Sequence, residues 1–165
     1  MRSLGVLLAV VTTSLIPSAC LPEAVPCPAI AQAPVVSLTV AASYAPTVKA
    51  IHLKACQDGT CREADLELMP GSTTVDLGCE PAAGPDGTCS ATSSPDGTLT
   101  GMLMMDALTE SRIDATAAGT STAGAPLPER QVSFMPKAEY PYGEQCGKFV
   151  TASLLLDADG LRQAG

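Results

Sequence analysis

The sequence has no tryptophan, few aromatic residues and few basic ones. Aromatic residues make up 3% of the 165 residues, and 9 Lys and Arg stand against 17 Asp and Glu, which gives a formal net charge of −8. Proteins that bind single-stranded nucleic acids stack the bases on aromatic side chains, and binding to the phosphate backbone needs Lys and Arg. The composition therefore predicts no nucleic-acid partner.

Histidine is also scarce, which limits the catalytic chemistry available to the chain. His52 is the only histidine, and the sequence contains no G-x-S-x-G motif, the motif that carries the nucleophile of many hydrolases. No two cysteines have the C-x2-C spacing that is typical of structural zinc sites. We therefore expect no enzymatic activity, no cofactor and no metal.

The N-terminus has the features of an export signal. Residues 1–19 contain Arg2 and an apolar run over residues 4–16, which is too short to span a bilayer comfortably. Residues 17–20 have the sequence PSAC, which resembles a bacterial lipobox, a motif whose cysteine is acylated and becomes the mature N-terminus. We therefore expect a signal peptide over 1–19, lipidation of Cys20, and a location on the extracytoplasmic face of the cell membrane.

Two features leave a plainly secreted protein open as the alternative. Pro17 occupies a position that is usually Leu in a lipobox. Ala31-Gln32-Ala33 also has the A-x-A pattern of a cleavage site, although it lies far from the apolar run and precedes Pro34.

The number of cysteines bears on whether the protein is lipidated at Cys20 or plainly secreted. There are seven cysteines, and an odd number in an exported protein needs an explanation, because exported proteins form disulfides. If Cys20 carries lipid, six remain, and six cysteines allow 15 pairings. The six candidates are Cys27, Cys56, Cys61, Cys79, Cys89 and Cys146.

Beyond the signal, the chain divides into a tether and one domain. Residues 20–34 are rich in proline, which favours a semi-extended tether. Residues 35–165 are long enough to bury one hydrophobic core. We find no repeat and no second domain.

The central feature of the domain is a predicted hairpin over residues 48–69. A turn at residues 57–60, which include Asp58-Gly59, places Cys56 opposite Cys61 and His52 opposite Asp65. Side chains alternate between the two faces of a strand, so this register separates an apolar face from a polar one. The apolar face contains Ile51, Leu53, Ala55, Ala64 and Leu66, and the polar face contains His52, Lys54, Glu63, Asp65 and the two cysteines.

This register predicts one disulfide and suggests a role for the only histidine, His52. Cys56 and Cys61 are expected to be bonded, and Cys79–Cys89 is expected from their proximity in sequence, which would leave Cys27–Cys146. A His52–Asp65 pair could perform acid–base chemistry, but on a solvent-exposed strand face we interpret it as a surface charge pair.

Short apolar alternations and frequent turn signals predict further strands. About eight short strands and no amphipathic helix favour an all-β fold, an antiparallel immunoglobulin-like β-sandwich, with a small β-barrel as the alternative. Besides the hairpin, we expect strands at 35–42, 73–77, 98–105, 111–118, 131–139 and 148–157, loops at 78–94 and 119–130, a turn at 95–97, and a tail at 161–165.

Two small groups of residues could hold a metal. Met102 and Met104 offer soft thioether ligands that suit Cu(I), and His52 is the third candidate, although methionine more often fills gaps in cores. Asp157 and Asp159 in the DADG segment match a fragment of a calcium loop, but the remaining oxygen ligands are missing. We therefore interpret DADG as a turn whose side chains bind its own backbone.

Three segments resemble a known group of proteins. CQDGTC at 56–61, the run GCE…CSA…SPDGTLTG and the late YPYGEQCG…LLLDADGL are similar to uncharacterised exported proteins of high-GC Gram-positive bacteria, mostly putative lipoproteins. The resemblance implies an immunoglobulin-like sandwich in the cell envelope and brings no activity. We expect a non-catalytic, lipid-anchored binding or accessory module for an unknown envelope protein or ligand, with a small metal- or ligand-carrying lipoprotein as the alternative.

Overall fold

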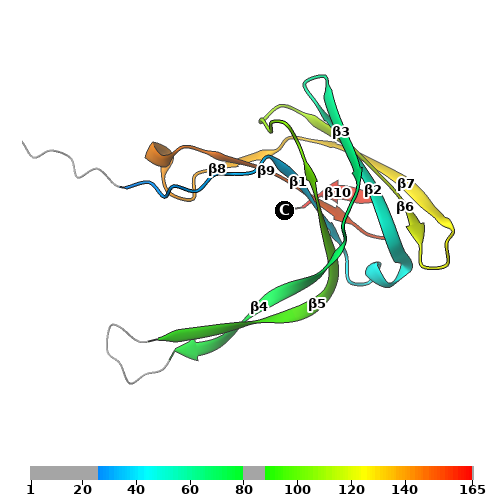
Figure 1. Ribbon diagram of the computed structural model, residues 1–165, viewed down its shortest axis with the longest axis horizontal. Helices are drawn as coiled ribbons and strands as arrows, with labels where there is room; N and C mark the ends of the chain where they lie inside the picture. Colours follow the sequence, from blue (N-terminus) through cyan, green and yellow to red (C-terminus); the bar gives the residue numbers. More distant parts are fainter. Residues whose placement is uncertain (1–25, 80–87, 165) are drawn as a thin grey trace, which may run out of the picture.

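The computed structural model describes residues 26–79 and 88–164. Its ten described strands form two sheets that pack face to face (Figure 1), so the expected all-β sandwich is confirmed. Neither sheet closes on itself within the described residues, and the alternative barrel is not formed by them. The strands are β1 (Val35–Val40), β2 (Val48–Gln57), β3 (Thr60–Asp65), β4 (Met69–Cys79), β5 (Cys89–Met104), β6 (Ile113–Ser121), β7 (Pro126–Phe134), β8 (Lys137–Glu139), β9 (Phe149–Leu156) and β10 (Leu161–Gln163).

The larger sheet has the strand order β10-β9-β1-β5-β4, and β8 pairs with β9 at its outer edge. The smaller sheet has the order β3-β2-β6-β7. In the central strands, alternate residues face the space between the sheets and are buried there, as in β1, where Val36, Leu38 and Val40 are fully buried. Branched and small apolar side chains fill this core, because these strands bury one face only.

The predicted hairpin is confirmed with its register. β2 and β3 pair with His52 opposite Asp65, Lys54 opposite Glu63 and Cys56 opposite Cys61. The apolar face expected from the sequence is buried at four positions: Ile51, Leu53, Ala55 and Leu66. Ala64 is the exception and is exposed, because β3 is the edge strand of its sheet.

The larger sheet is not purely antiparallel. β1 pairs with β9 in parallel, with Leu38 opposite Leu154. The tail expected at 161–165 is in fact strand β10, which pairs antiparallel with β9. The first pairing joins residues more than a hundred positions apart, and the second follows a tight turn. The local alternation of apolar residues predicts neither of them.

Two further expectations need correction on the other side of the sandwich. The loop expected at 119–130 is mostly strand, since β6 runs to Ser121 and β7 starts at Pro126. The turn between them has Gly124 at a φ of 82°, a conformation that glycine adopts without steric cost. The strand expected at 131–139 is divided between the sheets, because β7 ends at Phe134 and β8 begins after the buried Pro136.

The expected tether is held to the domain over its second half. Gln32 donates a hydrogen bond from Nε2 to the carbonyl oxygen of Val150 (2.6 Å) and accepts one from the Val150 N–H at Oε1 (3.0 Å). Its side-chain amide therefore pairs with β9 as a strand would. Cys27 is bonded to Cys146.

The signal peptide at 1–19 and Cys20 lie outside the described residues. In the part that is described, no helix has the length and apolar character needed to cross a membrane.

Candidate functional site

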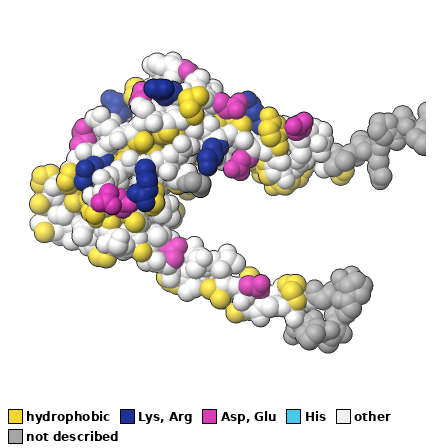
Figure 2. Space-filling view, turned by 180° about the vertical axis from the view of Figure 1, so that it is seen from behind, with side chains coloured by type: hydrophobic (Ala, Val, Ile, Leu, Met, Phe, Trp, Pro, Cys, Tyr) yellow, Lys and Arg dark blue, Asp and Glu magenta, His cyan; other side chains and the backbone are white. Residues whose placement is uncertain are grey.

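The most distinctive feature of the molecule is a hairpin arm that projects from the sandwich. It consists of β4 and the outer half of β5, and it leaves the body as a two-stranded ribbon (Figure 1). The space-filling view shows it standing clear of the body, with a wide hollow between them (Figure 2). β1 pairs with β5 only from Leu99 to Met104. The outer half of β5 is therefore paired with β4 alone.

The arm corrects the expected loop at 78–94 and the expected turn at 95–97, most of whose described residues belong to strands. No apolar alternation marks these strands, because neither face of the arm is buried. Serine, threonine and glycine dominate instead, a composition that is typical of loops. The short strand expected at 73–77 is confirmed as part of β4. One indication of the arm was the ten-residue spacing of Cys79 and Cys89. These cysteines lie opposite each other at the described end of the arm and form a disulfide.

The arm begins at an elbow where Gly71 faces three residues of β5. The register shifts between Pro70 and Ser72, and Asp96-Gly97-Thr98 bulges on the opposite strand. Asp96 Oδ1 accepts hydrogen bonds from the Thr98 N–H (2.9 Å) and the Thr98 hydroxyl (2.7 Å). These two hydrogen bonds lower the pKa of Asp96 from its usual value, and the bond from the hydroxyl has the larger effect. A Cβ at Gly71 would lie 1.9 Å from Thr98 Oγ1, so any side chain at this position would require Thr98 to move.

Beyond the elbow the arm is a ladder of small β-branched and hydroxyl residues. Thr73 lies opposite Ser94, Thr74 opposite Ser93, and Val75 opposite Thr92. Near the tip the register shifts again at Leu77, where Asp76 Oδ1 accepts a hydrogen bond from the Gly78 N–H (2.7 Å). Leu77 is 62% exposed, the most exposed large apolar side chain in the described residues.

The arm also differs from the other sheet edges in charge. Strand edges carry unpaired N–H and C=O groups, and proteins usually discourage further pairing there with charged residues. The edge strand β3 has three charges in six residues, and β8 has two in three. β4 has one charge, Asp76, in eleven residues. The described arm thus offers two unpaired, nearly uncharged edges, an arrangement that can accept an added strand from a partner.

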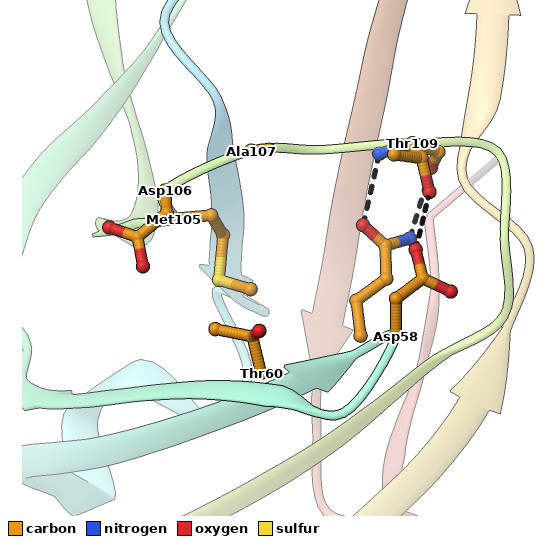
Figure 3. Close-up of a pocket in the computed structure, with 7 residues that line it drawn as sticks. Asp58, Thr60, Met105, Asp106, Ala107 and Thr109 are labelled. Carbon is orange, nitrogen blue, oxygen red and sulfur yellow. Dashed lines mark hydrogen bonds between the residues drawn. The ribbon is translucent and has the colours of Figure 1, made fainter.

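A small pocket away from the arm has a structural explanation. It encloses about 160 Å³ between the β2–β3 turn and residues 105–109 (Figure 3), which is below the usual range for small-molecule sites. Gln57 is buried there and binds only backbone. Its amide donates to the carbonyls of Thr109 (3.0 Å) and Ser111 (2.7 Å), and its Oε1 accepts from the Thr109 N–H (2.9 Å). No pattern in the sequence marks Gln57, whose hydrogen bonds hold this loop in place.

His52 and Asp65 meet as expected. His52 Nδ1 lies 2.9 Å from Asp65 Oδ1, and both side chains are exposed on the outer face of the smaller sheet. Asp65 is 89% exposed, so water screens the pair. The geometry is that of the surface charge pair predicted from the sequence.

The Met/His group is not brought together. Met102 and Met104 are each 58% exposed, which makes the expectation that they fill the core wrong. They alternate with the buried Leu103 and Met105 and therefore point away from the core on the larger sheet. His52 points away from the core on the smaller sheet, so the two groups lie on opposite outer faces. Among the described residues, no three His, Cys, Asp or Glu side chains gather as a metal site would require.

The DADG segment forms the turn predicted for it. Asp157 Oδ1 accepts hydrogen bonds from the N–H groups of Asp159 (2.9 Å) and Gly160 (3.0 Å), and Oδ2 pairs with Arg162. The Arg162 hydrogen bond is the main reason why the pKa of Asp157 lies below its usual value. Both oxygens are thus engaged by the chain itself.

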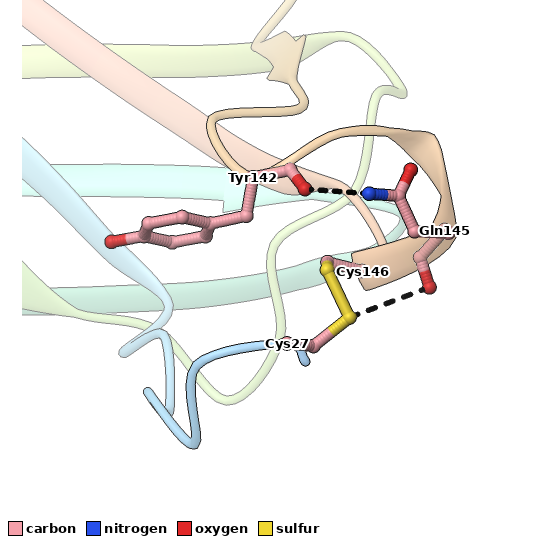
Figure 4. The surroundings of a disulfide bond; sticks show 4 residues. All are labelled: Cys27, Tyr142, Gln145 and Cys146. Carbon is pink, nitrogen blue, oxygen red and sulfur yellow. Dashed lines mark hydrogen bonds between the residues drawn. A yellow bond between two sulfur atoms is a disulfide. The ribbon is translucent and has the colours of Figure 1, made fainter. Parts of the chain in front are cut away.

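The three expected disulfides are present: Cys27–Cys146, Cys56–Cys61 and Cys79–Cys89. Figure 4 shows the first, which joins the N-terminal segment to the 3-10 turn η3 (Glu144–Cys146). Cys27 Sγ also lies 3.8 Å from the Gln145 carbonyl oxygen. The lipidation predicted at Cys20 falls outside the described residues.

No protein family, no curated protein and no solved structure matches this chain.

Proposed function

We propose that the protein is a non-catalytic, lipid-anchored module on the extracytoplasmic face of the cell membrane, which binds another envelope protein by adding that partner's extended segment to the β4–β5 arm. The observation that carries the proposal is the arm itself. A two-stranded ribbon alone is marginally stable in water, and this one keeps both edges unpaired and nearly uncharged, while β3 and β8 carry charges.

The disulfides support an exported protein, since such bonds persist in oxidising compartments. They also bear on processing. Cleavage after Ala33 would remove Cys27, the partner of Cys146, and Gln32, which binds Val150. Cleavage before Cys20 keeps both ties and leaves Cys20 as the one cysteine outside the three disulfides. This supports the lipidated form over the alternative of secretion after cleavage at Ala33.

Hydrogen exchange tests the docking proposal. In the purified protein the amides of 72–79 and 89–95 are expected to exchange fast at the arm's unpaired edges, and in the protein bound to native envelope vesicles they are expected to slow down. Val75→Lys places a charge on the arm and should abolish both binding and protection. Ala64→Lys, on the already charged edge of β3, is the matched control and should change neither. Equal exchange in both states, or full protection in Val75→Lys, would refute the proposal.

Intact mass of the N-terminal peptide tests the anchor separately. An acylated Cys20 is expected, and an unmodified N-terminus would instead establish the secreted alternative.

A further inference from the structure

The Cys27–Cys146 disulfide determines how much free chain separates the domain from the anchor. Only six residues, 21–26, lie between Cys20 and Cys27, and a chain of that length spans at most about 25 Å when fully extended. Residue 27 is bonded to the end of η3. A lipid on Cys20 would therefore hold the end of the sandwich that carries η3 close to the bilayer. Without the disulfide, a tether of 15 residues, 20–34, would leave the domain free to turn.

The end that carries η3 has the side chains that suit a bilayer surface. Tyr140 and Tyr142 lie just before η3, and Ile30 lies on the segment that follows Cys27. All three are at least 40% exposed, although the chain has only three tyrosines in total. The Tyr142 ring packs edge-to-face on Phe149, with centroids 5.9 Å apart, which holds it in place. Tyrosine is enriched at membrane interfaces because its ring is apolar and its hydroxyl is polar.

The arm points to the same end of the molecule. In Figure 1 the described ends of β4 and β5 lie at the same end of the long axis as the blue N-terminal segment and the short orange helical turn η3. Leu77, near the last described residues of β4, is exposed there. Figure 2 shows hydrophobic side chains at this end together with acidic ones, and Glu139 and Glu144 flank the two tyrosines.

From these three observations we infer that the bilayer surface is the partner of the η3 end, and that Ile30, Tyr140 and Tyr142 rest on it. The inference rests on the acylation of Cys20 in the proposed function. It also narrows the partner of the arm to a protein, or a part of one, that lies next to the membrane, since the arm extends toward the end of the molecule that carries η3.

The absence of tryptophan makes this contact directly measurable, because tyrosine emission is not masked. The acylated protein, isolated from membranes, is reconstituted into phosphatidylcholine vesicles with and without a lipid that carries a nitroxide quencher at the headgroup. Tyr44→Phe leaves only Tyr140 and Tyr142. The matched control, Tyr140→Phe/Tyr142→Phe, leaves only Tyr44, which precedes η1 (Ala45–Thr47) at the other end of the long axis (Figure 1).

We expect the quencher to cause a clear loss of emission in Tyr44→Phe and no loss in Tyr140→Phe/Tyr142→Phe. Equal quenching in the two variants would mean that the domain tumbles freely, and no quenching in either would mean that it stands away from the bilayer. Both results overturn the inference while leaving the lipid anchor intact. An N-terminal peptide without acyl groups would overturn the anchor itself, and the mass measurement reports this independently.

Discussion

Gly71 and Thr98 meet at the root of the arm so closely that a methyl group on Gly71 would lie 1.9 Å from Thr98 Oγ1 and 2.9 Å from Asp96 Oδ1. We expect Gly71→Ala to break the elbow and to destabilise the arm by about 1–3 kcal/mol, the usual effect of overpacking. Hydrogen exchange of those amides in 72–79 that pair with β5 would report the loss, while β1 and β9 stay protected. Adding Thr98→Ala removes the nearest clash, so the double variant should recover part of the protection. Unchanged exchange in Gly71→Ala would contradict the elbow as described.

The elbow is also expected to depend on pH. Hydrogen bonds from Thr98 lower the pKa of Asp96, so the folded arm favours the ionised carboxylate. The stabilisation is fully present above the carboxyl's unfolded pKa and is lost as the pH falls through the lower, folded value. The Thr98 amide should therefore exchange faster in acid than its neutral-pH behaviour predicts. Asp96→Asn, which does not titrate, should lack this acid transition, and an identical transition in that variant would assign it to another group.

The two faces of β2 predict opposite effects from neighbouring substitutions. Leu53 is fully buried, so Leu53→Ala should lower the free energy of unfolding by about 2–5 kcal/mol. Lys54 is exposed and pairs with Glu63 at 3.5 Å, so Lys54→Ala should change it by no more than about 0.5 kcal/mol. Denaturant unfolding of both variants measures the difference. Similar losses would mean that the strand does not separate core from solvent.

Gln57 is expected to stabilise the protein through backbone groups alone. Gln57→Leu has a similar volume but leaves the Thr109 N–H and the Thr109 and Ser111 carbonyls without this partner. We expect a loss of about 1 kcal/mol in the free energy of unfolding, the usual net contribution of such hydrogen bonds where the groups are only partly buried. Thr60→Ala, which also lines the pocket but is exposed, serves as the control and should be near neutral.

The disulfides should differ in their effect on stability by the length of chain that they close. In the chain-entropy account, removing Cys27–Cys146, which joins residues 119 apart, costs about 5 kcal/mol, against about 2 kcal/mol for a five-residue separation such as that of Cys56–Cys61. Paired Cys→Ala variants in denaturant unfolding test the order. A larger loss for Cys56–Cys61 would contradict it.

The sequence predicted most where one face of a strand is buried. In the hairpin, apolar residues alternate with His52, Lys54, Glu63 and Asp65, so one register satisfies both burial and charge, and the structure has that register. The DADG turn could also be predicted, because Asp157 accepts hydrogen bonds from groups only two and three residues away. The alternation in 98–105 also placed Met102 and Met104 on one face, but it gave no sign that this face is open to solvent.

The amino-acid sequence by itself determined the all-β class and the β2–β3 register, which places Cys56 opposite Cys61, because alternation and turn chemistry act over neighbouring residues. It left the partners of the other four cysteines open, and the tertiary structure decided them. Only the tertiary structure decided the parallel pairing of β1 with β9, the change of sheet at Pro136 and the projection of the arm. These depend on contacts between segments distant in the chain. Because the arm is not buried, its strands lack an apolar alternation, and the sequence predicted only the short strand at 73–77 within it.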